Sequence, residues 1–282
     1  TTLMVWQAGK VQFIEFFDLF LPAVVNFAVP AIIMTFFIPK GKPASITEKV
    51  ELKRGARRVM MLFLLTIVTA VCGHQFLGLP PVFGMMVGLG YLQFFGYFLR
   101  MSLPSSLAKK RTRAEQAHDE QQLRYLGSVV PFDIFKNVAR AEWDTLLFFY
   151  GVVMCVGGLG YLGYLQLVSV MLFDGVGASW AAFGIGVISA VVDNIPVMFA
   201  VLEMNPAISH GHWLLVTLAA GVGGSLLSVG SAAGVALMGA ARGNYTFMSH
   251  LRWTPVIFLG YVASMLLHLW LGDILGVFDI YN

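Results

Sequence analysis

The residues with the clearest chemical potential form the stretch Asp193-Asn194-Ile195-Pro196, in the middle of an apolar run from Ala178 to Met204. An ionisable side chain at membrane depth is energetically costly, and it is usually kept because it binds an ion or carries a proton. Carboxylate and amide oxygens are ligands that a hard cation such as Na+ prefers. Burial disfavours the charged form of a carboxyl group, whereas a bound cation favours it. We therefore expect a proton and Na+ to compete for Asp193.

A second stretch of small and hydroxyl residues, from Gly221 to Gly234, interrupts another apolar segment. Glycine allows a membrane helix to unwind, and unwound backbone at membrane depth is tolerated where it is buried or lines a cavity. Secondary transporters build ion sites from such discontinuous helices. Ser189 lies one helical turn before the acidic tip and should support it. The expected cation and proton site combines both stretches: Asp193 and Asn194 as Na+ ligands, Ser189, Ser228 and Ser231 as ligands or orienting groups, with Pro196 and Gly230 shaping the backbone.

Two further acidic residues, Glu142 and Asp144, stand where an apolar segment begins at Thr145. They could attract cations to the cytoplasmic entrance or respond to internal pH. Acidic side chains at a helix start also complement the helix dipole without any further role. The serines have a structural alternative as well, since hydroxyls at small-residue contacts often bond only across helices or to their own backbone.

The elements that must position these residues belong to a membrane protein. Of the 282 residues, 58% are hydrophobic and only 12% are charged, a composition that the surface of a soluble domain would not tolerate. Crossing a bilayer core of about 30 Å takes about 20 helical residues. Besides the acidic run, apolar segments of this kind lie near 20–38, 59–76, 82–99, 145–167, 213–228 and 253–272. The predicted fold class is an all-α polytopic membrane protein.

The distribution of basic residues predicts the topology. Lys and Arg gather at 40–58 and 100–140, which should face the cytoplasm. The acidic run could cross the membrane once, or turn at its tip and return as a re-entrant hairpin over 178–204. The loop at 205–212 lacks Lys and Arg, whereas the next link contains two Arg, and only the hairpin puts both on the expected sides. We therefore predict the hairpin, which leaves only Lys10 of 18 basic residues outside the cytoplasmic regions.

The two ends of the chain share one order of elements, which predicts inverted repeats with discontinuous helices. A short apolar half-helix, a polar link, an amphipathic piece and a spanning helix follow one another at the N-terminus and again after the glycine-rich stretch. The predicted division is 1–20 as the end of the first repeat's broken helix plus an interfacial helix, 21–100 as three transmembrane scaffold helices, 101–144 as a cytoplasmic basic loop, and 145–282 as the second repeat, with hairpin 178–204, broken helix 213–241 and a last transmembrane helix at 253–272.

At Ser189-Ala-Val-Val-Asp193-Asn194-Ile-Pro and Gly223-Gly-Ser-Leu-Leu-Ser228-Val-Gly-Ser231 the chain resembles the NhaD-type sodium/proton antiporters of the ion transporter superfamily. The resemblance runs from Thr1 to the C-terminus. It implies a transporter, not an enzyme, that exchanges cytoplasmic Na+ or Li+ for external H+ in a bacterial inner membrane and needs no cofactor. In that family a Gly-Asp-x-Thr-Thr stretch closes the ion motif of the first repeat. Thr1 and Thr2 resemble its tail and would close the site, with most of that repeat missing.

The expected partners are the lipid bilayer, the missing N-terminal half of the same protein in the same or a separate chain, and a second copy if the scaffold dimerises, with no nucleic acid. Gly84-Met-Met-Val-Gly88 predicts close helix packing, within the chain or at a dimer contact. The main alternative function is an anion carrier of the same superfamily, for arsenite or dicarboxylates, although an acidic tip would repel an anion. A noncatalytic membrane subunit is a weaker alternative. An intramembrane hydrolase is weaker still, because no motif here supplies its paired acid or nucleophile and base.

Overall fold

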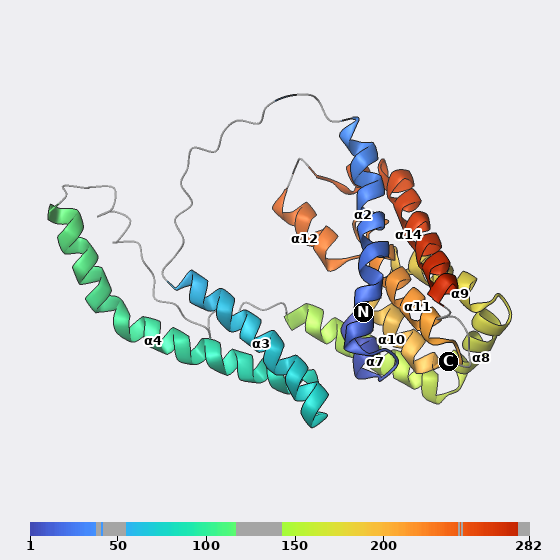
Figure 1. Cartoon of the computed structure of the whole chain (residues 1–282), viewed down its shortest axis with the longest axis horizontal. Coiled ribbons are helices and arrows are strands. Elements are labelled where there is room, and N and C mark those ends of the chain that lie inside the picture. Colours follow the sequence, from blue (N-terminus) through green and yellow to red (C-terminus); the bar gives the residue numbers. More distant parts are fainter. Residues whose placement is uncertain (38–40, 42–54, 117–142, 242, 244, 276–282) are drawn as a thin grey trace. The chain divides into compact units, whose positions relative to one another are not determined.

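The computed structural model of the chain describes residues 1–37, 41, 55–116, 143–241, 243 and 245–275 (Figure 1). Every regular element in these ranges is a helix. The chain divides into two compact units: residues 1–42 with 144–282, and residues 43–143. The elements are α1 (Thr2–Gln7), η1 (Phe13–Leu19), α2 (Phe20–Thr35), α3 (Ala56–Leu77), α4 (Pro81–Gln116), α7 (Trp143–Tyr161), α8 (Tyr164–Ser169), η2 (Val170–Asp174), α9 (Ala178–Ser189), α10 (Asn194–Met204), α11 (His210–Gly223), α12 (Ala232–Ala240), α13 (Phe247–Leu251) and α14 (Thr254–Leu275).

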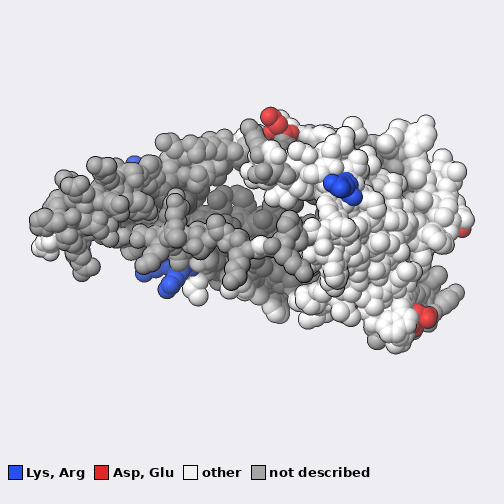
Figure 2. All heavy atoms as spheres, turned by 90° about the horizontal axis from the view of Figure 1, so that it is seen from above, with Lys and Arg blue, Asp and Glu red and all other residues white. Residues whose placement is uncertain are grey.

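Helices long and apolar enough to cross a membrane confirm the predicted class. Within the described residues four such helices are present: Phe13–Thr35, Ala56–Leu77, Pro81–Ser102 and Thr254–Ile274. Many of their large apolar side chains point outward, and the face drawn in Figure 2 shows only isolated charged groups among the described atoms. A surface of this kind suits lipid. The chain is therefore an all-α, multi-pass membrane protein.

The predicted span at 145–167 is wrong as one continuous segment. The helix α7 ends at Tyr161, and the chain bends by 82° before α8 begins at Tyr164. Gly163 caps this bend with a φ of 81°, a left-handed conformation that glycine adopts without steric cost. The apolar composition continues through the bend, so hydropathy alone gave no sign of it.

The smaller unit is built on the pair α3 and α4. A Cβ added at Gly84 would lie 2.3 Å from the Cα of Ala70, and one added at Gly88 would lie 2.1 Å from the side chain of Thr66. The two glycines therefore permit a very close approach of α4 to α3, as the Gly-x-x-x-Gly pattern predicts. This glycine face is used inside the chain. The helix α4 also continues to Gln116, so the first part of the region expected to be a loop is helical.

The larger unit pairs α2 with α14. A Cβ at Gly260 would lie 2.6 Å from the carbonyl oxygen of Asn26 and 2.8 Å from the ring of Pro30. Two residues beyond the end of α2, Phe37 packs on Trp253, which directly precedes α14, with ring centroids 5.4 Å apart. Residue numbers therefore rise along one helix as they fall along the other, which confirms the opposite directions expected of inverted repeats. Because of this contact α2 belongs with α14, whereas the sequence grouped it with α3 and α4.

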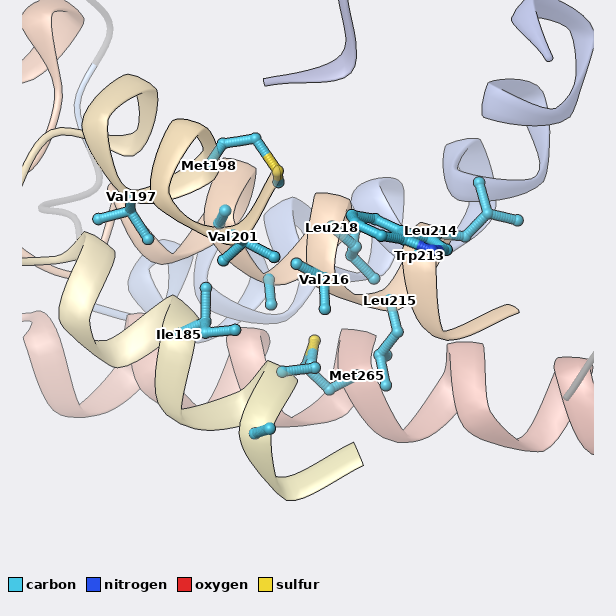
Figure 3. Packing of buried hydrophobic residues seen from close by; sticks show 14 of the residues in the cluster. Ile185, Val197, Met198, Val201, Trp213, Leu214, Leu215, Val216, Leu218 and Met265 are labelled. Carbon is cyan, nitrogen blue, oxygen red and sulfur yellow. The ribbon is translucent and has the colours of Figure 1, made fainter. Parts of the chain in front are cut away.

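The core of the larger unit lies between the two arms of the acidic run, α9 and α10, and the helices α11 and α14. Side chains from all four helices interdigitate there (Figure 3). The helix α11 is buried on nearly all sides, and several of its residues have no exposed surface. It is the central element on which the hairpin is built. The labelled members of this cluster are Ile185, Val197, Met198, Val201, Trp213, Leu214, Leu215, Val216, Leu218 and Met265.

Candidate functional site

The acidic run reverses direction, and contacts at one end of α11 establish this. Ser179, at the start of α9, lies 3.2 Å from His212 through its hydroxyl and the histidine Nε2. The end of α10 reaches the same end of α11. Asn205, which follows the last residue of α10, accepts a hydrogen bond from Lys10 at 2.5 Å, and the Lys10 ammonium group also lies over the ring of Trp213 in the first turn of α11. The run therefore enters and leaves at one end of α11. This reversal is the geometry that the predicted hairpin over 178–204 requires.

The first arm of the hairpin, α9, packs closely on α11 through a glycine contact and a hydrogen bond from one buried hydroxyl. A Cβ at Gly223 would lie 2.1 Å from the carbonyl oxygen of Gly186, so the two backbones touch. At the end of the arm the Ser189 hydroxyl donates to the carbonyl of Ala220 at 2.8 Å and is fully buried. A buried hydroxyl with a satisfied bond holds its neighbours in place. Ser189 is thus well placed to support the tip.

The tip of the hairpin places its polar groups at the start of α10. Asp193 is the N-cap of this helix, and its Oδ1 accepts a hydrogen bond from the Ile195 amide at 3.1 Å. Pro196 occupies the first turn, where a missing amide proton costs nothing. Asp193 and Asn194 are both half-buried. Among the described residues this amide is the hydrogen-bond partner of Asp193, which leaves Oδ2 available to a ligand.

The glycine-rich stretch unwinds between α11 and α12, over residues 224–231. At its end Ser231 is the N-cap of α12 and accepts a hydrogen bond from the Gly234 amide at 3.2 Å. Ser228 is only 2% exposed, yet its hydroxyl has no hydrogen-bond partner in the described part of the chain. A buried hydroxyl without a partner is uncommon and costs free energy. Such a group fits a site that is completed by a ligand.

The backbone of the unwound stretch contacts the backbone at the tip of the hairpin. A Cβ at Gly230 would lie 2.3 Å from the carbonyl oxygen of Ala190 and 2.9 Å from that of Ser189. The unwound stretch therefore rests directly on the tip of the hairpin, one turn before Asp193. The starts of α10 and α12, each capped by a polar side chain, flank this contact. The two stretches that the sequence analysis singled out therefore lie against each other.

The N-terminal helix α1 contacts α10 and α11. It brings Thr1 beside Gly221: a Cβ added at Gly221 would lie 3.5 Å from the Thr1 hydroxyl. Thr2 has a different environment: its side chain is exposed and lines a cavity of about 390 Å³ among aromatic residues of α1 and η1. The structure thus places Thr1, but not Thr2, against the predicted site.

The two acidic residues expected at the cytoplasmic entrance are described only in part. Asp144 lies in the first turn of α7 with an exposed side chain. Glu142 lies outside the described residues. The position of Asp144 at a helix start suits a dipole-complementing role and an ion-attracting role equally.

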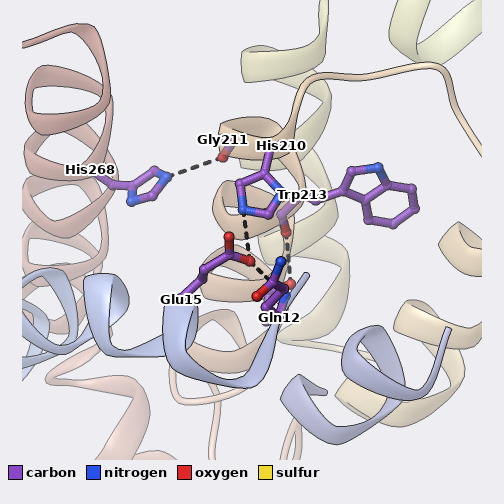
Figure 4. Close-up of polar contacts among 7 residues, drawn as sticks. Gln12, Glu15, His210, Gly211, Trp213 and His268 are labelled. Carbon is purple, nitrogen blue, oxygen red and sulfur yellow. Dashed lines mark hydrogen bonds and ion pairs between the residues drawn. The ribbon is translucent and has the colours of Figure 1, made fainter. Parts of the chain in front are cut away.

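A polar cluster that the sequence did not reveal surrounds the start of α11 (Figure 4). The carboxylate of Glu15, from η1, lies 3.1 Å from His210 Nε2 and accepts a hydrogen bond from the Gln12 amide at 2.6 Å. This close contact is not aligned as a hydrogen bond, because Nε2 makes none within the described residues, and it becomes an ion pair when His210 carries a proton. His268, from α14, lies 3.2 Å from the carbonyl oxygen of Gly211. The elements η1 and α14 therefore each contribute a side chain to this end of α11.

Comparison with known proteins gives family-level matches over most of the chain. Residues 3–221 match a family described as citrate transporter. A protein of Alkalimonas amylolytica named Na(+)/H(+) antiporter NhaD is 65% identical over 99% of this chain and 58% of its own length. The protein of the same name from Vibrio cholerae is 65% identical over 96% of the chain and 57% of its length. The Arabidopsis thaliana protein named sodium/proton antiporter 1 is 29% identical over 95% of the chain and 44% of its length. The chain thus spans little more than half of the bacterial relatives, and no solved structure matches it.

Proposed function

Because the chain belongs to the citrate transporter family, we propose that it forms the ion-binding part of a secondary transporter that exchanges cytoplasmic Na+ or Li+ for external H+ across a bacterial inner membrane. The relatives that are 65% identical carry the name Na(+)/H(+) antiporter, which supports this activity. The observation that carries the proposal is the contact between the capped hairpin tip and the unwound stretch. It puts a carboxylate, an amide and a buried unpaired hydroxyl in one region.

Each step of the exchange uses a group of this region. Asp193 binds Na+ through the carboxylate oxygen that the Ile195 amide does not engage, or it binds a proton instead. Asn194 and Ser228 add the uncharged oxygens that a hard cation requires. The Ser231 hydroxyl accepts one hydrogen bond from the Gly234 amide and can still bind the cation through its oxygen. Thr1, whose hydroxyl lies beside Gly221, closes the site from the first repeat. Because protonated and cation-bound carboxyl groups exclude each other, one ion leaves when the other binds.

The description of the family names citrate, which makes an anion substrate the second candidate. Anions bind at helix N-termini because unpaired amides point outward there. At the start of α10 the Asp193 carboxylate already accepts from the Ile195 amide, and its negative charge would face the anion. The acidic cap therefore favours a cation over arsenite or a dicarboxylate.

The substitution Asp193→Asn tests the proposal in everted vesicles that contain the full-length protein. Addition of Na+ or Li+ should dissipate a pre-formed pH gradient, followed by a pH-sensitive dye, in the wild type but not in the variant. The control is Asp144→Asn, which removes an exposed acid at the start of α7 and should leave a clear exchange signal. Both variants should insert in the membrane at wild-type amounts. Na+-dependent proton flux in Asp193→Asn, or citrate-dependent and Na+-independent flux in the wild type, would refute the proposal.

The remaining partners follow from the same proposal. The helices with outward apolar side chains contact lipid, and the N-terminal half of the same protein supplies the other repeat. The scaffold helices would also form the contact with a second copy in a homodimer. Since α3 already covers the face of Gly84 and Gly88, a homodimer would use another surface.

A further inference from the structure

The unwound stretch is held from one side by three hydrogen bonds from the connector that follows it. His250, on α13, lies with its Nε2 3.1 Å from the carbonyl oxygen of Ser225 and 3.3 Å from that of Leu226. The Thr254 hydroxyl, at the start of α14, donates to the same Leu226 carbonyl at 2.9 Å. These two carbonyls belong to an unwound segment. Side chains from 24 to 28 residues away therefore act as their hydrogen-bond donors.

The identity of the partners fixes the direction of each bond. A carbonyl oxygen can only accept, so the hydrogen of His250 must be on Nε2. On the other side of the ring, Nδ1 lies 2.6 Å from the hydroxyl of Tyr245. Burial raises the pKa of Tyr245, and its phenol therefore keeps the proton that it donates to Nδ1. Tyr245 thus selects the histidine tautomer whose Nε2 can donate to the carbonyls.

The two anchored carbonyls lie directly before the groups expected to bind the cation. Ser228 follows Leu226 by two residues, and the stretch folds back on itself, because a Cβ at Gly224 would lie 2.8 Å from the carbonyl oxygen of Gly230. At the start of α12 a Cβ at Gly234 would lie only 2.2 Å from the carbonyl oxygen of Ser228. In so compact a turn, the positions of Ser225 and Leu226 determine where the Ser228 hydroxyl lies.

We propose that His250 and Thr254 are positioning residues of the cation site. They hold the carbonyl groups of Ser225 and Leu226, and so keep the Ser228 hydroxyl and the Gly230 backbone in place at the hairpin tip. Neither side chain touches the cation in this assignment. The assignment rests on the proposed function, because it concerns the affinity of the same site.

The test compares His250→Ala with His250→Gln in the full-length protein. The alanine variant loses the donor to both carbonyls, and the KM for Na+ should rise about tenfold, as expected when hydrogen bonds of ordinary strength are lost. Glutamine carries an amide that can donate to the same carbonyls, so it should restore most of the affinity. The control is His74→Ala: His74 makes a similar contact, at 3.1 Å, with the carbonyl of Leu79 in the other unit. The His74→Ala variant should have the KM for Na+ of the wild type.

Two further variants separate positioning from a general loss of structure. Thr254→Val removes the hydroxyl but keeps the shape of the side chain, and the KM should rise, whereas Thr254→Ser should behave as the wild type. Tyr245→Phe removes the donor that selects the tautomer, and it should weaken Na+ binding less than His250→Ala does. In each variant the maximal rate should change less than the KM.

A readout that needs no transport completes the experiment. Backbone amides of residues 224–231 in the purified protein should exchange hydrogen faster in His250→Ala than in His250→Gln. If the wild type exchanges Na+ but His250→Ala keeps both its KM and its amide protection, the positioning assignment is overturned while the proposed function stands. Equal behaviour of the alanine and glutamine variants would also overturn it. A wild type without Na+-dependent flux would instead refute the proposed function.

Discussion

The contact of Gly230 with the hairpin tip makes Gly230→Ala the most informative substitution in this chain. A Cβ at this position would lie 2.3 Å from the carbonyl oxygen of Ala190, although real Cβ contacts essentially never fall below 3.0 Å. The backbones must therefore separate by at least 0.7 Å, the difference between these two distances. The carbonyl oxygen is a backbone atom and the position of the Cβ is fixed by the backbone, so no side-chain rotation relieves the overlap. The unwound stretch and the tip that carries Asp193 must move apart.

A shift of this size is large for a binding site. Ligand groups must be held within roughly 0.5 Å of their productive positions, and overpacking of a closely fitted contact costs about 1–3 kcal/mol. A loss of that order in the bound state lowers affinity by about tenfold to a hundredfold. We therefore expect Gly230→Ala to raise the KM for Na+ by at least about tenfold, while the protein still inserts in the membrane.

The assay is Na+-dependent collapse of a pH gradient in everted vesicles, measured over a series of Na+ concentrations and normalised to the amount of inserted protein. Gly239→Ala is the matched control, because a Cβ there meets nothing within 4 Å and the substitution lies in a nearby helix. It should transport as the wild type does. If Gly230→Ala shows the KM and maximal rate of the control, the hairpin tip and the unwound stretch do not form one cation site.

Two other predictions follow from the same structure. Ser228→Ala removes a buried hydroxyl without a partner, so it should weaken Na+ binding without lowering the thermal denaturation midpoint, whereas Ser264→Ala removes a hydroxyl bonded at 2.8 Å to a carbonyl and should cost about 1 kcal/mol of stability. A lower denaturation midpoint in Ser228→Ala than in Ser264→Ala would contradict the assignment. Gly88→Ala would place a Cβ 2.1 Å from the side chain of Thr66 and should destabilise the α3–α4 pair by about 1–3 kcal/mol, while Gly90→Ala, with nothing within 4 Å, should not. Equal thermal denaturation midpoints for these two glycine variants would show that the pair is not closely packed.

The fold class and the hairpin could be predicted because they depend on local properties of the sequence. The apolar length of a segment and the charge of its flanking loops are present in the residues themselves. The hairpin prediction was decided by the absence of Lys and Arg at 205–212, and the contacts of Ser179 with His212 and of Asn205 with Lys10 agree with a reversal of the chain. The adjacency of the two polar stretches was inferred from inverted-repeat logic, and the contact of Gly230 with Ala190 shows it.

The features that escaped prediction depend on backbone conformation or on distant contacts. The bend at Gly163 requires a left-handed φ at one glycine among several in that segment, and hydropathy does not single it out. The bond between His250 and Ser225 joins residues 25 apart in the sequence. The ion pair of Glu15 with His210 joins an amphipathic piece to a helix that starts almost 200 residues later. Neither pairing has a local signal, because each exists only once elements distant in the sequence have packed together.

The interlocked glycines of α9 and α11 limit how this protein can move. The carbonyl of Gly186 fills the place that a side chain at Gly223 would occupy, so neither helix can slide along the other without a steric clash. The hairpin and the first half of the broken helix must therefore travel as one rigid body. In the proposed exchange, the ion would reach the two sides of the membrane through displacement of this whole body. A substitution that allowed the two helices to slide past each other would then uncouple ion binding from that displacement.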